Sequence, residues 1–210
     1  MKERPIIFNT ESVLAILDGR KTVTRRVINP QPIKDKRNPD YRLPSWSLRQ
    51  GRTYCEWFFG PQNTTSNGDL LYWRSPYGEP GYRLWVKEMW YPSREGAVYY
   101  ADNEHGFVSP KAGWKSPLFM PRSVSRIILE VVDLRAERLH EITNEETIKE
   151  GVEYIGQSLY RYNHLVSSEA VNLYEKQWNN INAKRGYHWE DNPWVWRVEF
   201  RRFQDDMPVR

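Results

Sequence analysis

Residues 19–26 read Gly19-Arg20-Lys21-Thr22-Val23-Thr24-Arg25-Arg26 and mark the passage from a helix to a strand. Just before them, apolar residues recur at helical spacing, and Asn9 or Thr10 can cap the helix that they predict. Gly19 follows Asp18 and can adopt the left-handed conformation that ends a helix. The sequence therefore predicts a short amphipathic helix with a defined end, after which the chain turns into a basic segment.

The basic segment continues as a strand, because three β-branched residues follow one another at its centre. Alternation along this strand puts Lys21, Val23 and Arg25 on one face and Thr22, Thr24 and Arg26 on the other. Lys21 stands at the start of the strand, and its long, flexible stem lets it swing towards Thr24. A lysine beside a threonine hydroxyl and guanidinium groups can bind an anion or activate a nucleophile. The alternative is a turn with a solvated basic face, because lysine and arginine are ordinary surface residues.

The spacing Gly19-x-Lys21-x-x-x-x-Arg26 resembles the GxKxxxxR signature of the ASCH domain, a PUA-like β-barrel family associated with RNA and modified nucleosides. The run GYRLWVKE at 81–88 resembles the "GDxLWVRE" strand of that family. Three further segments resemble its phage and prophage branch: 120–132, Glu150-Gly151 and PWVWRVEF at 193–200. These matches occur in the order that the family requires, from the first helix to the last strand.

The resemblance implies an α+β fold, namely a PUA-like (ASCH) mixed β-barrel flanked by helices, with loop-rich insertions. We expect a single domain over 1–210, with insertions at 29–75 and 92–120. Patterning predicts strands at Thr22–Thr24, Thr53–Phe59, Leu70–Trp73, Tyr82–Val86, Ala97–Ala101, Ser125–Leu134 and Trp194–Phe200. It predicts further helices from Thr143 to Gly151, with Glu146 completing a capping box, and from Ser168 to about Ala183. The nearly unbroken apolar run in the strand at 125–134 predicts that both of its faces are covered.

Small bacterial members of the family resemble amidohydrolases that cleave N4-acetylcytidine to cytidine and acetate. Their machinery is a lysine, a threonine three residues later and a distant glutamate, which implies catalytic roles for Lys21, Thr24 and Glu150. Threonine is a poor nucleophile unless a neighbour takes its proton, and a desolvated lysine can do so. A carboxyl group opposite can protonate the departing nitrogen or hold the edge of the base.

Competing residues leave these assignments open at this point. Thr22 matches Thr24 in composition, and strand threonines are common for their β-branching alone. Glu145, Glu146 and Glu153 compete with Glu150, and exposed helix carboxylates are the ordinary interpretation for all of them.

Substrate or nucleic-acid contacts are predicted from Arg20, Arg25, Arg26, Trp85, Glu88 and Arg122. Trp85 lies between basic residues, as in surfaces where bases stack on rings while cations hold phosphates, although a core position explains it equally well. Two non-hydrolytic alternatives remain, a binding module for RNA or a modified base and a single-stranded RNA nuclease. The expected partner is a nucleoside or single-stranded RNA, with modified DNA as a variant of the same chemistry.

Composition is consistent with these expectations. The net charge of +4 suits a partner with phosphates, and the high content of tryptophan and tyrosine suits the core of a β-rich domain. Cys55 is the only cysteine, which indicates a reducing compartment. No apolar stretch is long enough to span a bilayer, so we expect a protein of the cytoplasm of a bacterial or phage-infected cell, with no membrane contact. The four histidines are scattered, so no metal and no cofactor is expected.

Overall fold

The computed structural model describes residues 2–32, 45–49, 52–56, 72–103 and 113–203. The described α-helices are α1 (Thr10–Leu17), α2 (Asn144–Lys149) and α3 (Ala170–Asn182). The described strands are β1 (Glu3–Ile7), β2 (Val23–Val27), β3 (Ser45–Arg49), β4 (Arg52–Glu56), β5 (Tyr72–Trp73), β6 (Arg83–Lys87), β7 (Trp90–Ser93), β8 (Gly96–Tyr99), β9 (Ile128–Arg138), β10 (Glu153–Gly156), β11 (Leu159–Tyr162), β12 (Leu165–Ser167) and β13 (Trp194–Arg202).

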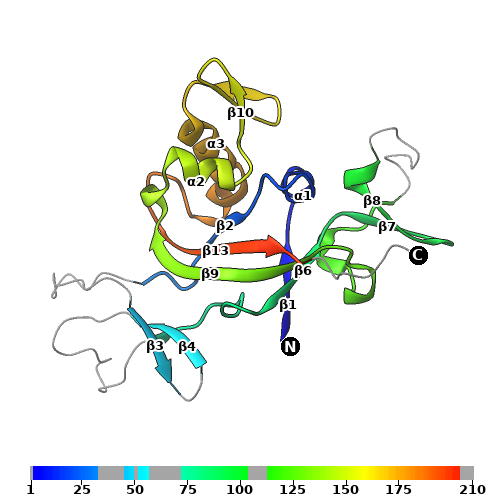
Figure 1. The fold of residues 1–210 in the computed structure, drawn as a ribbon, viewed down its shortest axis with the longest axis horizontal. Helices are drawn as coiled ribbons and strands as arrows, with labels where there is room; N and C mark the ends of the chain where they lie inside the picture. Colours follow the sequence, from blue (N-terminus) through cyan, green and yellow to red (C-terminus); the bar gives the residue numbers. More distant parts are fainter. Residues whose placement is uncertain (1, 33–44, 50–51, 57–71, 104–112, 204–210) are drawn as a thin grey trace.

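The central sheet contains five strands in the order β1-β6-β9-β13-β2. β1 runs parallel to β6, and the other neighbours are antiparallel. Figure 1 shows α2 and α3 on one side of β9 and β13. The fold is therefore α+β, as expected, with a mixed sheet. Within the described residues no backbone pairing joins β2 to β1.

The local signals around the first helix are confirmed. Asn9, and not Thr10, is the N-cap, and its side chain accepts a hydrogen bond of 3.1 Å from the backbone nitrogen of Ser12. Gly19 has a φ of +74°, which a residue with a Cβ rarely adopts. The two ends of α1 are therefore set by side-chain and backbone preferences that act over a few residues.

The first half of the last strand, residues 194–198, is buried on both faces. Trp194, Trp196, Val198 and Phe200 enter the main apolar core, as the alternation predicts. On the opposite face Val195 packs in a second apolar cluster under α3. This strand therefore separates the main core from a smaller layer between the sheet and the helices.

The expectation for the strand at 125–134 is wrong in part. The observed strand β9 begins later and extends to Arg138, and buried and more exposed positions alternate along it. Val132 is 49% exposed, so the apolar run is not covered on both faces. The helices cover the sheet further along, where Val195 of β13 lies opposite Glu137.

The first expected insertion contains the predicted strand pair. β4 pairs antiparallel with β5, with Cys55 opposite Trp73, and β3 adds a strand on the other side that the patterning missed. The predicted strand residues 57–59 and 70–71 lie outside the described residues. In the second expected insertion β7 and β8 form an antiparallel hairpin. Across the described part of the chain, no helix is both long and apolar enough to cross a membrane.

Candidate functional site

A cavity of about 480 Å³ opens between α1, β2 and α3. Its walls also include the end of β1 and single residues from other segments, namely Tyr77, Met89 and Pro117. A volume of this size falls within the range of small-molecule sites, roughly 300–1,000 Å³. Five residues predicted from the sequence line it: Lys21, Thr24, Arg25, Arg26 and Glu150.

Backbone contacts hold the two residues before β2 against α1 and the end of α2. The nitrogen of Lys21 donates to Ala15 O over 2.9 Å, and that of Thr22 donates to Lys149 O over 2.9 Å. Gly151 ends α2 with a φ of +105°, and a Cβ at this position would lie 3.1 Å from Ala15 Cβ and 3.6 Å from Lys21 Cβ. Glycine is therefore favoured here for its backbone conformation and for the close approach of Ala15, and Lys21 lies at ordinary contact distance.

Lys21 and Glu150 form a buried ion pair at the wall of the cavity. Lys21 Nζ lies 2.6 Å from Glu150 Oε2 and also donates to the Glu150 carbonyl oxygen over 2.7 Å. Each residue is 3% exposed. Burial lowers the pKa of Lys21 below its usual value; the charge of Glu150 opposes this shift, and Arg25 and Arg26 reinforce it. The amine is thus held in place and loses its proton more readily than a surface lysine.

The second oxygen of Glu150 has two further donors. Arg25 Nη1 lies 3.3 Å from Oε1, and the hydroxyl of Tyr174 on α3 donates to the same oxygen over 3.2 Å. Burial, and next the charge of Glu150, raise the pKa of Tyr174 well above its usual value, so the hydroxyl keeps its proton and acts as a donor. Both carboxylate oxygens are therefore engaged, which fixes the orientation of Glu150 towards Lys21.

Arg25 connects three carboxylates beneath the cavity wall. Its side chain is 0% exposed, with Nε 2.7 Å from Glu137, Nη2 3.0 Å from Glu146 and Nη1 near Glu150. Burial alone would lower the pKa of Arg25, but Glu150, Tyr174 and Glu137 together raise it. Because protein carboxylates occupy its nitrogens, Arg25 ties β2 to β9 and α2.

Thr24 and Arg26 lie on the other face of β2. Thr24 is opposite Val198 of the main core, whereas Arg25 is opposite Arg197, whose guanidinium contacts α2, so the predicted alternation is confirmed. Arg26 Nη2 donates to Ile7 O over 2.6 Å, and its guanidinium carbon lies 5.0 Å from the centre of the Phe8 ring. Lys21 Nζ lies 5.9 Å from the centre of the same ring, so Lys21 and Arg26 both approach Phe8.

Two other predicted contact residues are held in ion pairs away from the cavity. Arg20 contacts Asp18 at 2.8 Å and donates to Gly151 O over 3.2 Å. Glu88 is buried and accepts two hydrogen bonds of 3.0 Å from Arg126. Neither of the two lines the cavity.

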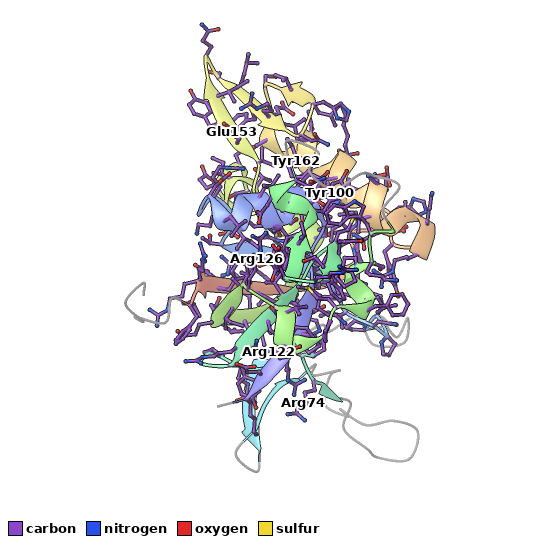
Figure 2. All side chains as sticks on the ribbon, turned by 90° about the vertical axis from the view of Figure 1, so that its right-hand side faces the viewer. Arg74, Tyr100, Arg122, Arg126, Glu153 and Tyr162 are labelled. Atoms are coloured by element: carbon purple, nitrogen blue, oxygen red, sulfur yellow. The ribbon has the colours of Figure 1, made fainter. Side chains whose placement is uncertain are left out.

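Trp85 and Arg122 also lie outside the cavity lining. Trp85 is half-buried in β6, with Lys87 Nζ 5.5 Å from the centre of its ring. Arg122 is exposed and pairs with Glu3 at 2.7 Å. Figure 2 shows Arg122 in the lower part of the molecule, well apart from Tyr162 and Glu153 in the upper part. The structure thus gathers Lys21, Arg26 and Glu150 at one cavity, and Trp85 and Arg122 lie outside its lining.

The competition among the glutamates is resolved by position. Glu150 reaches the cavity, whereas Glu153 pairs with Arg161 at 2.8 Å on the β10–β11 sheet. Thr143 caps α2 by accepting from the nitrogen of Glu146 over 3.3 Å. The expected return bond from Glu146 to its own helix is wrong, because that carboxylate accepts from Arg197 at 2.8 and 3.0 Å and from Arg25.

The ion pairs of Glu146 predict that the fold loses stability in acid. Hydrogen bonds from Arg197, and next from Arg25, lower the pKa of Glu146 from 4.5 to about 2. Because this pKa is lower in the folded than in the unfolded protein, the ionised carboxylate stabilises the fold above about pH 4.5. This contribution is lost as the pH falls from about 4.5 to about 2. The loss is at most about 3 kcal/mol, because partial solvent access screens the pair.

This prediction is tested by measuring the free energy of unfolding in urea as a function of pH. Glu146→Gln should be less stable than the parent at pH 7 and should lose less stability between pH 4.5 and 2. Equal slopes in that window for parent and variant would contradict this assignment.

Sequence reasoning missed several residues of the cavity wall. Tyr174 and Ile181 of α3 both line the cavity, and Ile181 is 46% exposed. Gln177 and Arg185 also line it. A usable signal was the tyrosine itself, since a buried hydroxyl on an apolar stripe needs a hydrogen-bond partner.

No protein family, curated protein or solved structure matches this chain. Among the residues that the structure describes, no three histidine, cysteine, aspartate or glutamate side chains gather as metal ligands would. A functional assignment therefore rests on the cavity, its ion pairs and the sequence motif that lines it.

Proposed function

We propose that this chain is a PUA-like domain of the ASCH type whose cavity hydrolyses the amide of an acylated nucleobase such as N4-acetylcytidine. The observation that carries the proposal is the buried amine of Lys21, held by Glu150 in the same cavity wall as Thr24. A lysine with a lowered pKa that lines the same cavity as a threonine hydroxyl supports this reaction, because a neutral amine can take the proton of a weak nucleophile. Lys21, Thr24 and Glu150 come from the positions that the motif implies.

The proposed fold is a barrel in which β2 approaches the end of β1. The side chain of Arg26 spans this edge by donating to the Ile7 carbonyl oxygen, and the cavity lies beside it. The GxKxxxxR motif would thus contribute both the reactive pair and the side chain that bridges the two edge strands.

The proposed reaction uses Lys21 as a proton carrier. The neutral amine takes the proton of Thr24 as its oxygen attacks the acetyl carbon, and the carbonyl electrons move to the carbonyl oxygen. The ammonium of Lys21 then protonates N4 of the base as the C–N bond breaks, which releases cytidine and leaves an acetyl ester on Thr24. Water, deprotonated by Lys21, cleaves the ester to acetate and restores the hydroxyl. Such proton transfers are typically worth about a hundredfold to ten-thousandfold in rate.

Glu150 would position the amine and stabilise the ammonium that forms. Its oxygens accept from Lys21, Arg25 and Tyr174, so the carboxylate is turned towards the protein framework. This contact pattern supports an orienting role for Glu150, in the way that a buried aspartate orients histidine in serine hydrolases.

Release of cytidine and acetate from N4-acetylcytidine tests the proposal. The parent should form both products in equal amounts, and Thr24→Val, which keeps the shape and removes the hydroxyl, should lose at least about a hundredfold in rate. Chromatography follows cytidine, and an enzymatic assay follows acetate. No product at high protein concentration would overturn hydrolysis of this substrate.

A non-catalytic binding module is the second candidate. The 2.6 Å contact between Lys21 and Glu150 favours it, because a tight buried pair also serves to hold a pocket in shape. In that case a nucleoside or a base of single-stranded RNA would bind in the cavity and be recovered unchanged. Binding without product formation would favour this function.

A further inference from the structure

Two arginines in the cavity wall have no carboxylate partner among the described residues. Lys21 and Arg25 are matched by glutamates, but Arg26 and Arg185 form no ion pair. Arg185 ends the short turn η5 (Ala183–Arg185) that follows α3, and its contact is a long one of 3.5 Å to the Asn182 side chain. The wall thus contains positive charge that no carboxylate in the described part of the chain pairs with.

Arg26 retains donors beyond those that the fold uses. One amino group donates to Ile7 O, and the guanidinium carbon lies over the Phe8 ring, 5.0 Å from its centre, and these two contacts hold the group in place. The Nε of Arg26 is buried and has no acceptor. A fixed guanidinium with uncommitted nitrogens is the form in which arginine binds planar or tetrahedral oxyanions.

Tyr77, Arg26 and Arg185 all line this cavity. Burial raises the pKa of Tyr77, and the charges of Arg26 and Arg185 oppose that shift. The hydroxyl of Tyr77 therefore keeps its proton at neutral pH and can donate a hydrogen bond.

Glu11 is the second carboxylate, besides Glu150, in the lining of the cavity. Glu11, in the first turn of α1, also lines the cavity, but its charge acts on Tyr162 rather than on Tyr77. Among the described residues, neither Arg26 nor Arg185 forms an ion pair with a carboxylate of the wall, whereas Lys21 is paired with Glu150.

We propose that Arg26, Arg185 and Tyr77 form an anion subsite, and that the ligand of this cavity is a phosphorylated nucleoside. Phosphate oxygens accept from guanidinium and hydroxyl groups together, whereas a free nucleoside leaves both arginines without a counter-charge. The phosphate is either a terminal monoester or the diester of a polynucleotide. This inference rests on the proposed function only for the identity of the nucleobase. The anion subsite consists of charged groups that the proposed reaction does not use.

Isothermal titration with ligands that cannot be hydrolysed tests this subsite. The dissociation constants of cytidine, cytidine 5′-monophosphate and the trinucleotide CpCpC are compared in the parent. A phosphate should tighten binding by about tenfold or more, the scale of a hydrogen bond to a charged group. A stronger gain for the monophosphate indicates a terminal phosphate, and a stronger gain for the trinucleotide indicates a diester. Equal affinities for all three ligands, or no binding of any, overturn the proposal.

Two variants that each remove one positive charge show where the phosphate binds. Arg185→Gln should weaken binding of the phosphorylated ligand. The dissociation constant of cytidine divided by that of the phosphorylated ligand should therefore fall towards one. Lys184→Gln, one residue earlier and outside the cavity lining, should leave the ratio near its parent value. Equal effects of the two variants would mean a general electrostatic attraction and overturn the subsite. If N4-acetylcytidine is not hydrolysed but the ratio responds as expected, the proposed reaction fails while the subsite stands.

Discussion

Lys21→Met is expected to lower kcat/KM for N4-acetylcytidine by about a hundredfold to ten-thousandfold, the usual contribution of a positioned proton-transfer group. The variant removes the amine that the proposed reaction uses twice, once as a base and once as an acid. Glu150 keeps its hydrogen bonds from Arg25 and Tyr174, so the variant should still fold. The measurements are steady-state kinetics and the urea unfolding midpoint.

Lys21→Arg separates proton transfer from charge. Arginine keeps the positive charge beside Glu150 but cannot act as a base near neutral pH. Cytidine binding should persist in this variant while turnover is lost. If both Lys21 variants hydrolyse N4-acetylcytidine as the parent does, Lys21 is not the catalytic base.

Arg25→Met is expected to destabilise the protein by about 3–5 kcal/mol, the cost of removing one partner from a buried ion network. The side chain of Arg25 is 0% exposed and contacts Glu137, Glu146 and Glu150. Methionine fills similar space but leaves these carboxylates without their shared cation. The free energy of unfolding in urea gives the magnitude, and circular dichroism shows whether the variant folds at all.

Arg161→Met is the matched control, because it removes the same charge from an exposed pair. Arg161 contacts Glu153 at 2.8 Å on the surface of the β10–β11 sheet. Exposed ion pairs contribute about 0–1 kcal/mol, so this variant should stay near the parent. A destabilisation below about 1 kcal/mol for Arg25→Met would show that the network does not stabilise the fold.

The contrast between these two arginines shows where sequence reasoning stops. Arg25 was predicted as a ligand contact because it is a cation in a basic motif. Its partners come from β9 and α2, more than 100 residues away in the chain, and they turn it into a buried connection within the protein. Arg185 was not singled out at all, because an arginine after a helix carries no local signal for a cavity.

Local patterns were sufficient where the physical cause is local. Asn9 caps α1, Gly19 ends it, and alternation in β2 separates Thr24 from Arg25, because backbone dihedrals and side-chain direction depend on neighbouring residues. The motif also predicted Lys21 and Thr24 as members of one site. The apolar run at 125–134 misled the prediction, since hydrophobicity alone does not say which face of β9 the helices cover.

The sequence by itself determined the α+β class, the first helix and its strand, and the residues of the GxKxxxxR motif. Only the tertiary structure decided that Glu150 meets Lys21 across 129 residues and that Tyr174 donates to the same carboxylate. The reason is physical: capping and alternation arise from contacts within a few residues. A buried ion pair, a lowered lysine pKa and an unmatched arginine each depend on which distant segments exclude water together.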